Sequence, residues 1–236
     1  MLDLPLSYRL LKAIPGGCHL LLVGDVDQLP SVGAGNFLGD VIESGVAPVT
    51  RLTEIFRQAA SSLIVANAHR INQGIPPALD NDPEGDFFFF NIETGKTAAE
   101  QVQSLVTERI PNKFGIRPED IQVLSPMYRG EAGVNSLNQR LQDALNPAGR
   151  RKKERSLAGT RFREGDRVMQ IKNEYDKEVF NGDIGRLVKI DEEDGTLTVE
   201  MDGRGVTYEF SEAEQRVLAY ASTIHKSQGS EYPCVV

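Results

Sequence analysis

The chain has 236 residues, of which 40% are hydrophobic and 25% charged, and its formal net charge is -8 at pH 7. These values are typical of a globular protein with one large or two small domains, and they argue against a generally polybasic nucleic-acid coat. They leave room for a nucleic-acid site built from a local basic patch.

Cysteine usage and apolar runs limit the class further. Cys18 and Cys234 lie far apart with no histidine at ligand spacing, so we expect no disulfide framework and no metal site, and we predict a cytoplasmic location. The apolar runs are short, and Asp3 and Pro5 interrupt the start of the chain. We therefore expect neither a membrane span nor a signal peptide.

The first 150 residues alternate between strand-like and helix-like segments. Short apolar runs that end at turn residues indicate buried strands, and apolar residues three and four positions apart indicate helices. The predicted strands are 18–24, 49–52, 86–92 and 121–124, and the predicted helices are 36–43, 61–72, 97–110 and 133–145. This alternation predicts an α/β fold whose parallel sheet has helices on both faces.

The pattern changes near Gly149. Residues 150–172 hold nine Lys or Arg against three acids, whereas residues 191–214 hold nine acids and one Arg. Asn-Gly and Asp-Gly pairs separate short strand-like runs and favour tight turns, which predicts a small antiparallel barrel inserted into the sheet. The strand-like runs are 167–171, 184–190, 196–201 and 206–210, and the sheet would resume as strand 217–220, helix 223–228 and strand 234–236.

Two segments in the first part of the chain contain side chains suited to phosphate chemistry. The loop GDVDQLPSVGAG follows a predicted strand, and its Asp25 and Gln28 could orient a water or a phosphate oxygen, although a solvated turn would look the same. Arg57 lies between a strand and a helix, where a guanidinium could reach a γ-phosphate or simply face solvent.

Two further segments resemble phosphate-binding sites. Thr223, His225 and Lys226 cluster at a predicted helix start, a natural phosphate-binding position, although an ordinary buried histidine would give the same pattern. Gly95-Lys96-Thr97 resembles the end of a phosphate-binding loop, but Phe90 stands where that loop needs glycine. We therefore predict a helix start there.

The order and spacing of these segments resemble the RecD-like branch of superfamily-one DNA helicases. GDVDQLPSVGAG is similar to helicase motif III, LTEIFRQ with IVANAHRINQG to motif IV, and YASTIHKSQGSEYP to motif V. VLSPMYRGEAGVNSLNQRLQDALNP resembles a segment of the second RecA-like domain in this family. FREGDRVMQIKNEYDKEVFNGDIGRLVKI resembles the Src-homology-like barrel of its stand-alone bacterial members.

The resemblance implies a RecA-like parallel sheet interrupted by a small antiparallel Src-homology-like β-barrel. It divides the chain into the end of a first RecA-like domain (1–80), the first part of a second (81–150), the inserted barrel (151–215) and the continuation of the second domain (216–236). The family's phosphate-binding lysine loop, its magnesium-binding Asp-Glu pair and its motif VI are not found in this sequence. We therefore expect a helicase fragment that is inactive alone.

The resemblance also implies ATP-driven 5′-to-3′ translocation and unwinding by the longer protein, with ATP and Mg²⁺ as its cofactors and none bound to the fragment. The implied partners are single-stranded DNA and duplex ends, with no membrane and no obligate protein partner. The implied site residues are Gln28, Arg57 and Asp25 for catalysis, Gly229 and Glu231 for nucleotide binding, and Thr223, His225, Ser125, Tyr128 and Arg129 for DNA binding. A conjugative relaxase with the same helicase domain, and a non-catalytic nucleic-acid or protein interaction module, remain alternatives.

Overall fold

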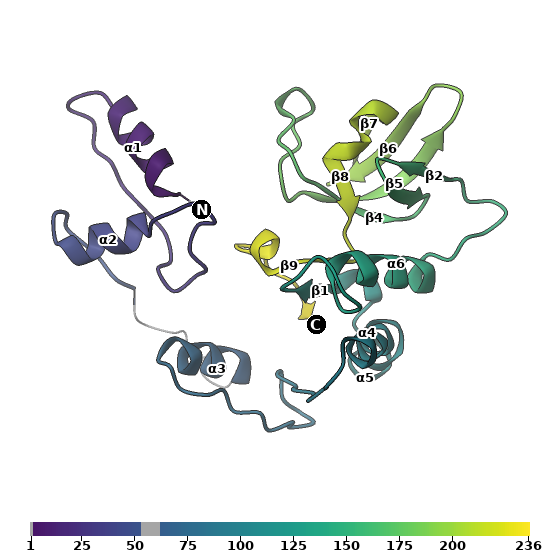
Figure 1. Ribbon diagram of the computed structural model, residues 1–236, viewed down its shortest axis with the longest axis horizontal. Helices are drawn as coiled ribbons and strands as arrows, with labels where there is room; N and C mark the ends of the chain where they lie inside the picture. The colour runs from purple at the N-terminus through teal and green to yellow at the C-terminus, as the bar shows by residue number, and fades with distance from the viewer. Residues whose placement is uncertain (1, 53–61) are drawn as a thin grey trace. The chain divides into compact units, whose positions relative to one another are not determined.

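The computed structural model of the chain describes residues 2–52 and 62–236 (Figure 1). It divides into two compact units, residues 1–91 and residues 92–236. No helix within the described ranges has the length and apolar character that crossing a membrane requires.

The described part of the first unit is built from helices and loops. Its helices are α1 (Leu4–Ala13), α2 (Phe37–Ser44) and α3 (Leu63–Asn72). Asp3 caps α1 by accepting a hydrogen bond from the Leu6 N–H at 2.8 Å, and Ser62 caps α3 by accepting from the Val65 N–H at 3.2 Å. The helices predicted at 36–43 and 61–72 are confirmed as α2 and α3, and residue 61 lies outside the described residues.

The three strands predicted in this unit do not form among the described residues. Segments 18–24, 49–52 and 86–92 are loops, and the side chains of Leu21 and Val23 are 84% and 87% exposed. A parallel strand needs neighbouring strands to satisfy its backbone groups and helices to cover its faces. The described residues of this unit supply no such neighbours, so the prediction of strands was wrong here.

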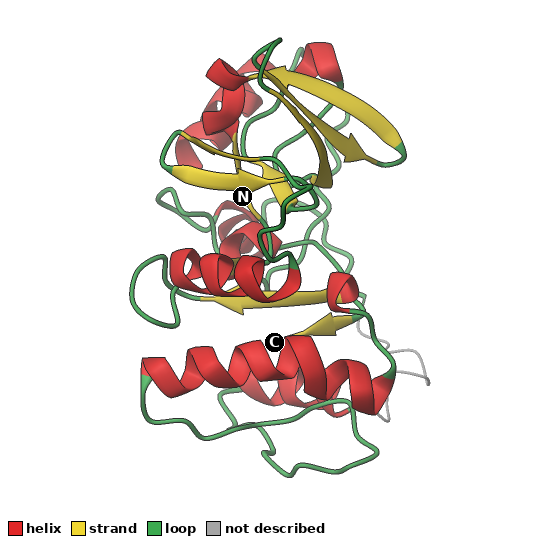
Figure 2. Cartoon of the chain, turned by 90° about the vertical axis from the view of Figure 1, so that its right-hand side faces the viewer, coloured by secondary structure: helices red, strands yellow, loops and turns green. Residues whose placement is uncertain are grey.

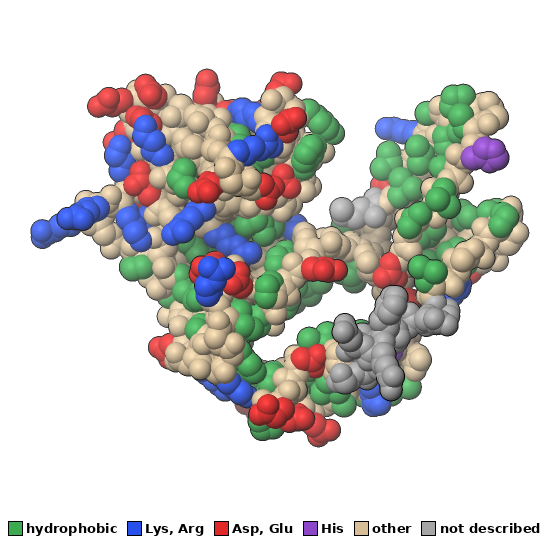
Figure 3. Space-filling model, turned by 180° about the vertical axis from the view of Figure 1, so that it is seen from behind, with side chains coloured by type: hydrophobic (Ala, Val, Ile, Leu, Met, Phe, Trp, Pro, Cys, Tyr) green, Lys and Arg blue, Asp and Glu red, His purple; other side chains and the backbone are tan. Residues whose placement is uncertain are grey.

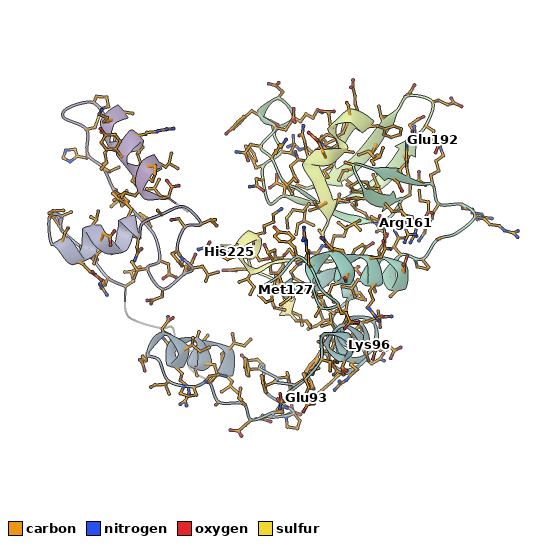
Figure 4. All side chains as sticks on the ribbon, in the orientation of Figure 1. Glu93, Lys96, Met127, Arg161, Glu192 and His225 are labelled. Carbon is orange, nitrogen blue, oxygen red and sulfur yellow. The ribbon has the colours of Figure 1, made fainter. Side chains whose placement is uncertain are left out.

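The second unit begins with a long helix that changes its winding. It runs through α4 (Gly95–Ser104), a π-helical turn (Leu105–Arg109) and α5 (Ile110–Phe114). Pro111 lacks an N–H donor, and the preceding Ile110 N–H bonds to the Leu105 carbonyl in the wider π pattern. Thr94 caps the start of α4 by accepting a hydrogen bond from the Thr97 N–H at 3.2 Å. The helix start predicted at Gly95-Lys96-Thr97 is therefore confirmed, and Figure 4 labels Glu93 and Lys96 beside it.

A small parallel sheet forms the centre of this unit. Its strand order is β10 (Cys234–Val235), β1 (Ile121–Ser125) and β9 (Ala221–Thr223), and α6 (Val134–Leu145) packs beside β9. The strands predicted at 121–124 and 234–236 and the helix at 133–145 are confirmed. Segment 223–228, expected as a helix, instead ends β9 and continues as a 3-10 turn, Ile224–Ser227.

We call residues Glu154–Leu218 the β module. It contains β2 (Glu154–Leu157), β3 (Thr160–Arg163), β4 (Arg167–Gln170), β5 (Ile184–Asp191), β6 (Thr196–Met201), β7 (Arg204–Glu209) and β8 (Arg216–Leu218). The antiparallel order is β7-β6-β5-β4-β8, with β2 and β3 as a separate hairpin, and Figure 2 shows these strands above the parallel sheet. Short 3-10 turns lie at Pro118–Asp120, Tyr175–Lys177 and Phe210–Gln215.

The mixed α/β fold with an inserted antiparallel module is confirmed, with one correction. The strand expected at 217–220 does not rejoin the parallel sheet, because β8 pairs with β4 inside the β module. Ala219 and Tyr220 then carry the chain directly into β9. One continuous run of residues therefore contributes strands to two sheets. Hydrophobic periodicity and composition do not show where one strand ends and the other begins.

Replacing Gly185 should destabilise the β module. Gly185 lies on β5, and a Cβ atom there would stand 2.6 Å from both the Glu200 carbonyl oxygen and the Met201 Cγ. We expect Gly185→Ala to lower the free energy of unfolding by about 1–3 kcal/mol, the usual cost of overpacking. Urea denaturation would measure it, with Gly205→Ala as the control, since a Cβ at Gly205 meets only the Thr198 methyl at 3.5 Å. An equal loss of unfolding free energy in Gly185→Ala and Gly205→Ala would contradict the overpacking explanation.

Candidate nucleic-acid interface

Two segments predicted separately from the sequence meet at one edge of the parallel sheet. β1 and β9 run parallel with Ser125 opposite Thr223, so their carboxyl ends lie together. The loop 125–129 follows β1, and the turn Ile224–Ser227 follows β9. We call residues 125–129 and 223–225 the carboxyl edge. In open α/β sheets, ligands bind at this end of the strands.

Side-chain hydrogen bonds fix β9 on its outer side. The Asn138 amide of α6 donates to the Ala221 carbonyl and accepts from the Ala221 N–H, both at 2.9 Å. The hydroxyls of Ser222 and Ser227 are 2.8 Å apart and link the strand to the turn that follows it. This arrangement gives an edge strand a substitute partner and holds the turn in place.

The turn after β9 presents its residues differently. Thr223 is buried, and its Oγ1 accepts from the Lys226 N–H at 3.3 Å, which leaves the hydroxyl proton available to another acceptor. His225 is exposed and is labelled in Figure 4 near Met127, which belongs to the loop after β1. The Lys226 side chain is half-buried, and this burial lowers the pKa of its ammonium group.

The loop after β1 combines a buried anchor with exposed side chains. Ser125 is buried, and its hydroxyl lies 2.8 Å from the Ala132 carbonyl oxygen, to which it donates. Tyr128 and Arg129 are exposed. Ser125 therefore shapes the loop, while Tyr128 and Arg129 face solvent.

A cavity of about 320 Å³ adjoins the carboxyl edge. It is enclosed by the tip of the β2–β3 hairpin, by α6 and by β9 with its following turn. Tyr128 and Thr223 line it, together with Lys226 and Arg161. The sequence places Lys226 in the cluster at a phosphate-binding position and Arg161 in the basic run 150–172, but neither is among the predicted site residues.

The residues expected to bind and hydrolyse the nucleotide lie in both units. In the first, the Gln28 amide donates to the Asp25 carboxylate at 3.3 Å, which brings these two side chains together in an exposed loop. In the second, Gly229 and Glu231 lie in the exposed segment before β10, and Gly229 has φ +82, a conformation that favours glycine. Arg57 lies outside the described residues.

The basic run 150–172 is not one surface. Arg163 is 1% exposed and binds Glu154 at 2.9 Å, and Arg167 donates to the Ile121 carbonyl at 3.2 Å while burial lowers the pKa of its guanidinium. Residues 150–153 form an exposed cluster in the loop between α6 and β2, and Arg155 and Lys172 are also exposed. Figure 3 shows Lys and Arg side chains that project from the left edge of the second unit. The solvated part of the run is therefore short.

A buried carboxylate ties the β module to the parallel sheet. The Asp166 side chain accepts from the Gln142 and Asn146 amides at 2.6 and 2.7 Å, from the Arg163 N–H at 2.6 Å and from the Tyr220 hydroxyl at 3.0 Å. Burial raises the pKa of Asp166 against the opposing effect of these hydrogen bonds. Burial and the Asp166 charge together raise the pKa of Tyr220. The network spans α6, the module and the segment entering β9.

The described ranges contain no cluster of metal-ligating side chains. They bring together no group of three His, Cys, Asp or Glu side chains able to hold an ion.

Family models match three parts of the chain. A model described as the ATP-dependent RecD-like DNA helicase SH3 domain matches residues 137–201. A model described as an AAA domain matches residues 1–87, and a model of the UvrD-like helicase C-terminal domain matches residues 218–236.

Known proteins show similarity across almost the whole chain. The ATP-dependent RecD2 DNA helicase of Deinococcus radiodurans is 37% identical over 98% of this chain, which spans 30% of that relative's length. The RecBCD enzyme subunit RecD of Mycolicibacterium smegmatis is 29% identical over 98% of the chain, which spans 42% of its length. The fold is similar to that of the Bacteroides Pif1 helicase solved with ADP-AlF3 and ssDNA, with TM-score 0.51 and 20% identity over 90% of this chain and 54% of that one.

Proposed function

The chain is RecD-like in sequence over nearly its whole length, and from this premise we propose that it forms part of an ATP-dependent DNA helicase. The proposed activity is 5′-to-3′ translocation on single-stranded DNA coupled to duplex unwinding in the cytoplasm. The observation that carries the proposal is the meeting of residues 125–129 with residues 223–225 at the carboxyl edge.

At this edge, we propose that the strand is held by its backbone. The Thr223 hydroxyl and the His225 imidazole donate to phosphate oxygens, Arg129 supplies positive charge, and the exposed Tyr128 ring stacks on a base. Contacts to phosphate carry no sequence information, which suits an enzyme that must move along any strand. Ser125 contributes through the shape of the loop.

For the ATP chemistry, we propose roles that follow the motifs. Gln28, steadied by Asp25, senses the γ-phosphate and the attacking water. The Gly229 backbone and the Glu231 carboxylate bind the nucleotide, the latter through a ribose hydroxyl. Arg57 stabilises charge on the phosphoryl group during transfer. ATP and Mg²⁺ are the expected cofactors of the complete protein.

The DNA interface is tested by titrating a fluorescein-labelled oligothymidylate with the protein at several salt concentrations. We expect fluorescence anisotropy to report binding that weakens as salt rises, because phosphate contacts release counterions. Arg129→Ala should reduce the slope of log K against log salt by about 0.7, the value for one single-strand phosphate contact. Arg186→Ala, on β5 of the module and outside the carboxyl edge, should leave the slope unchanged. An unchanged slope in Arg129→Ala would remove that residue from the interface.

The exposed cluster at residues 150–153 motivates a second candidate, a non-catalytic nucleic-acid or protein interaction module. Replacing Arg150, Arg151, Lys152 and Lys153 together by alanine separates the two candidates. Under the helicase proposal, this variant keeps most of its affinity for single-stranded DNA. Complete loss of binding, with the carboxyl-edge variants unaffected, would favour the interaction module instead.

A further inference from the structure

We propose that the cavity beside the carboxyl edge is a nucleotide-binding pocket, which receives one base of the single strand and holds its phosphate on Lys226 and Arg161. The proposal rests on the proposed function and assigns residues of the β module to the DNA path. It therefore makes the β module a wall of the DNA site.

The cavity has the size and lining of a small-molecule site. Its volume of about 320 Å³ is at the lower end of the range of about 300–1,000 Å³ found for ligand pockets. Its apolar lining includes Met169, Val217 and Leu218, which come from two strands of the β module. An apolar lining of this kind accepts the faces of any base without reading its edges.

Two cationic side chains, Arg161 and Lys226, line the cavity. The Arg161 Nε is buried and has no hydrogen-bond partner among the described residues, although the Nη2 of the same guanidinium binds Asp143 at 2.9 Å. No described residue accepts a hydrogen bond from the half-buried Lys226 ammonium group, whose pKa burial lowers. A buried N–H donor without an acceptor, such as the Arg161 Nε, costs free energy. A phosphate group bound in the cavity would offer oxygen acceptors to both side chains.

The cavity is continuous with the carboxyl edge. Tyr128 and Thr223 belong to that edge and also line the cavity, so a strand bound at the edge passes its mouth. On the opposite side stands the tip of the β2–β3 hairpin, a two-residue turn in which Ala158 and Gly159 both have positive φ, of 48° and 78°. Such a turn matches the twist of the strands and gives the cavity a fixed wall.

The pocket is tested with oligothymidylates that each carry a single abasic position, titrated against the protein by fluorescence anisotropy. Because stacking of one base contributes about 1–3 kcal/mol, we expect one abasic position to weaken binding by fivefold or more. Thr160→Trp places a large ring in the cavity and should therefore abolish the extra loss of affinity caused by that abasic position. Circular dichroism should show that the fold of this variant is unchanged.

The cationic residues are tested by charge removal. Lys226→Met and Arg161→Met should each weaken binding and lower the salt slope by about 0.7, and neither Arg186→Met nor Lys189→Met should do so. If the protein binds single-stranded DNA but no abasic position stands out and both variants behave as the controls, the pocket proposal is overturned and the proposed function stands. If the unaltered protein fails to bind single-stranded DNA at low salt, both are overturned.

Discussion

Replacing Arg57 by alanine is expected to lower the turnover number for ATP hydrolysis about a thousandfold or more in the complete protein. The motif LTEIFRQ resembles helicase motif IV, and an arginine that stabilises the transferring phosphoryl group contributes about 10³–10⁵ to the rate in related phosphoryl-transfer enzymes. Its charge acts mainly in the transition state, so the affinity for ATP should change little. Steady-state ATPase assays with saturating single-stranded DNA would measure the turnover number. Titration with a fluorescent ATP analogue would measure the affinity for ATP.

Arg51→Ala provides the matched control, because it removes the same charge a few residues earlier in the chain, where the side chain is exposed. It should retain nearly full turnover. Normal hydrolysis by Arg57→Ala would take this residue out of the catalytic set. A large loss of ATP affinity in place of turnover would reassign it to ground-state binding.

Replacing Asp166 by alanine is expected to lower the free energy of unfolding of the second unit by about 3–5 kcal/mol. The carboxylate accepts from Gln142, Asn146 and Tyr220, and all of these partners are largely buried. Its removal leaves their donors and the Arg163 backbone N–H unsatisfied, and it takes away one of the three carboxylates near the buried Arg163 guanidinium, the other two being Glu154 and Asp143. Chemical denaturation followed by circular dichroism would measure the loss.

Asp194→Ala is the control, since Asp194 lies in the exposed turn between β5 and β6 and should change stability by no more than about 0.5 kcal/mol. Asp166→Asn, which keeps the shape and one acceptor oxygen, should be less harmful than Asp166→Ala. A loss in Asp166→Ala no larger than that of the control would show that the network does not hold the β module to the sheet.

Elements with strong local signals could be predicted from the sequence. Segment 63–72 is a helix because Ser62 caps it, and its apolar residues recur at helical spacing. The turns at 194–195 and 202–203 form because Asp-Gly pairs favour tight hairpins, so the strands that they connect lie close to the predicted positions. These signals act between residues close in the chain and need no knowledge of distant partners.

Elements that depend on distant partners could not be predicted in this way. Segment 18–24 has the composition of a buried strand, yet among the described residues it pairs with no neighbour and remains a loop. The run 217–223 divides between two sheets because its pairing partners, β4 and β1, come from different parts of the chain. Composition sets what a segment can form, and the available partners decide what it does form.

The sequence by itself determined which residue types stand in which order, and on that basis the motifs around Gln28, Arg57 and Thr223 predict phosphate chemistry. Only the tertiary structure decided which residues share one surface. It set Ser125 opposite Thr223, placed Arg161 and Lys226 on the lining of one cavity, and buried Asp166 against the amides of Gln142 and Asn146. These contacts join residues far apart in the chain, and their geometry depends on strand register and packing, which no local pattern encodes.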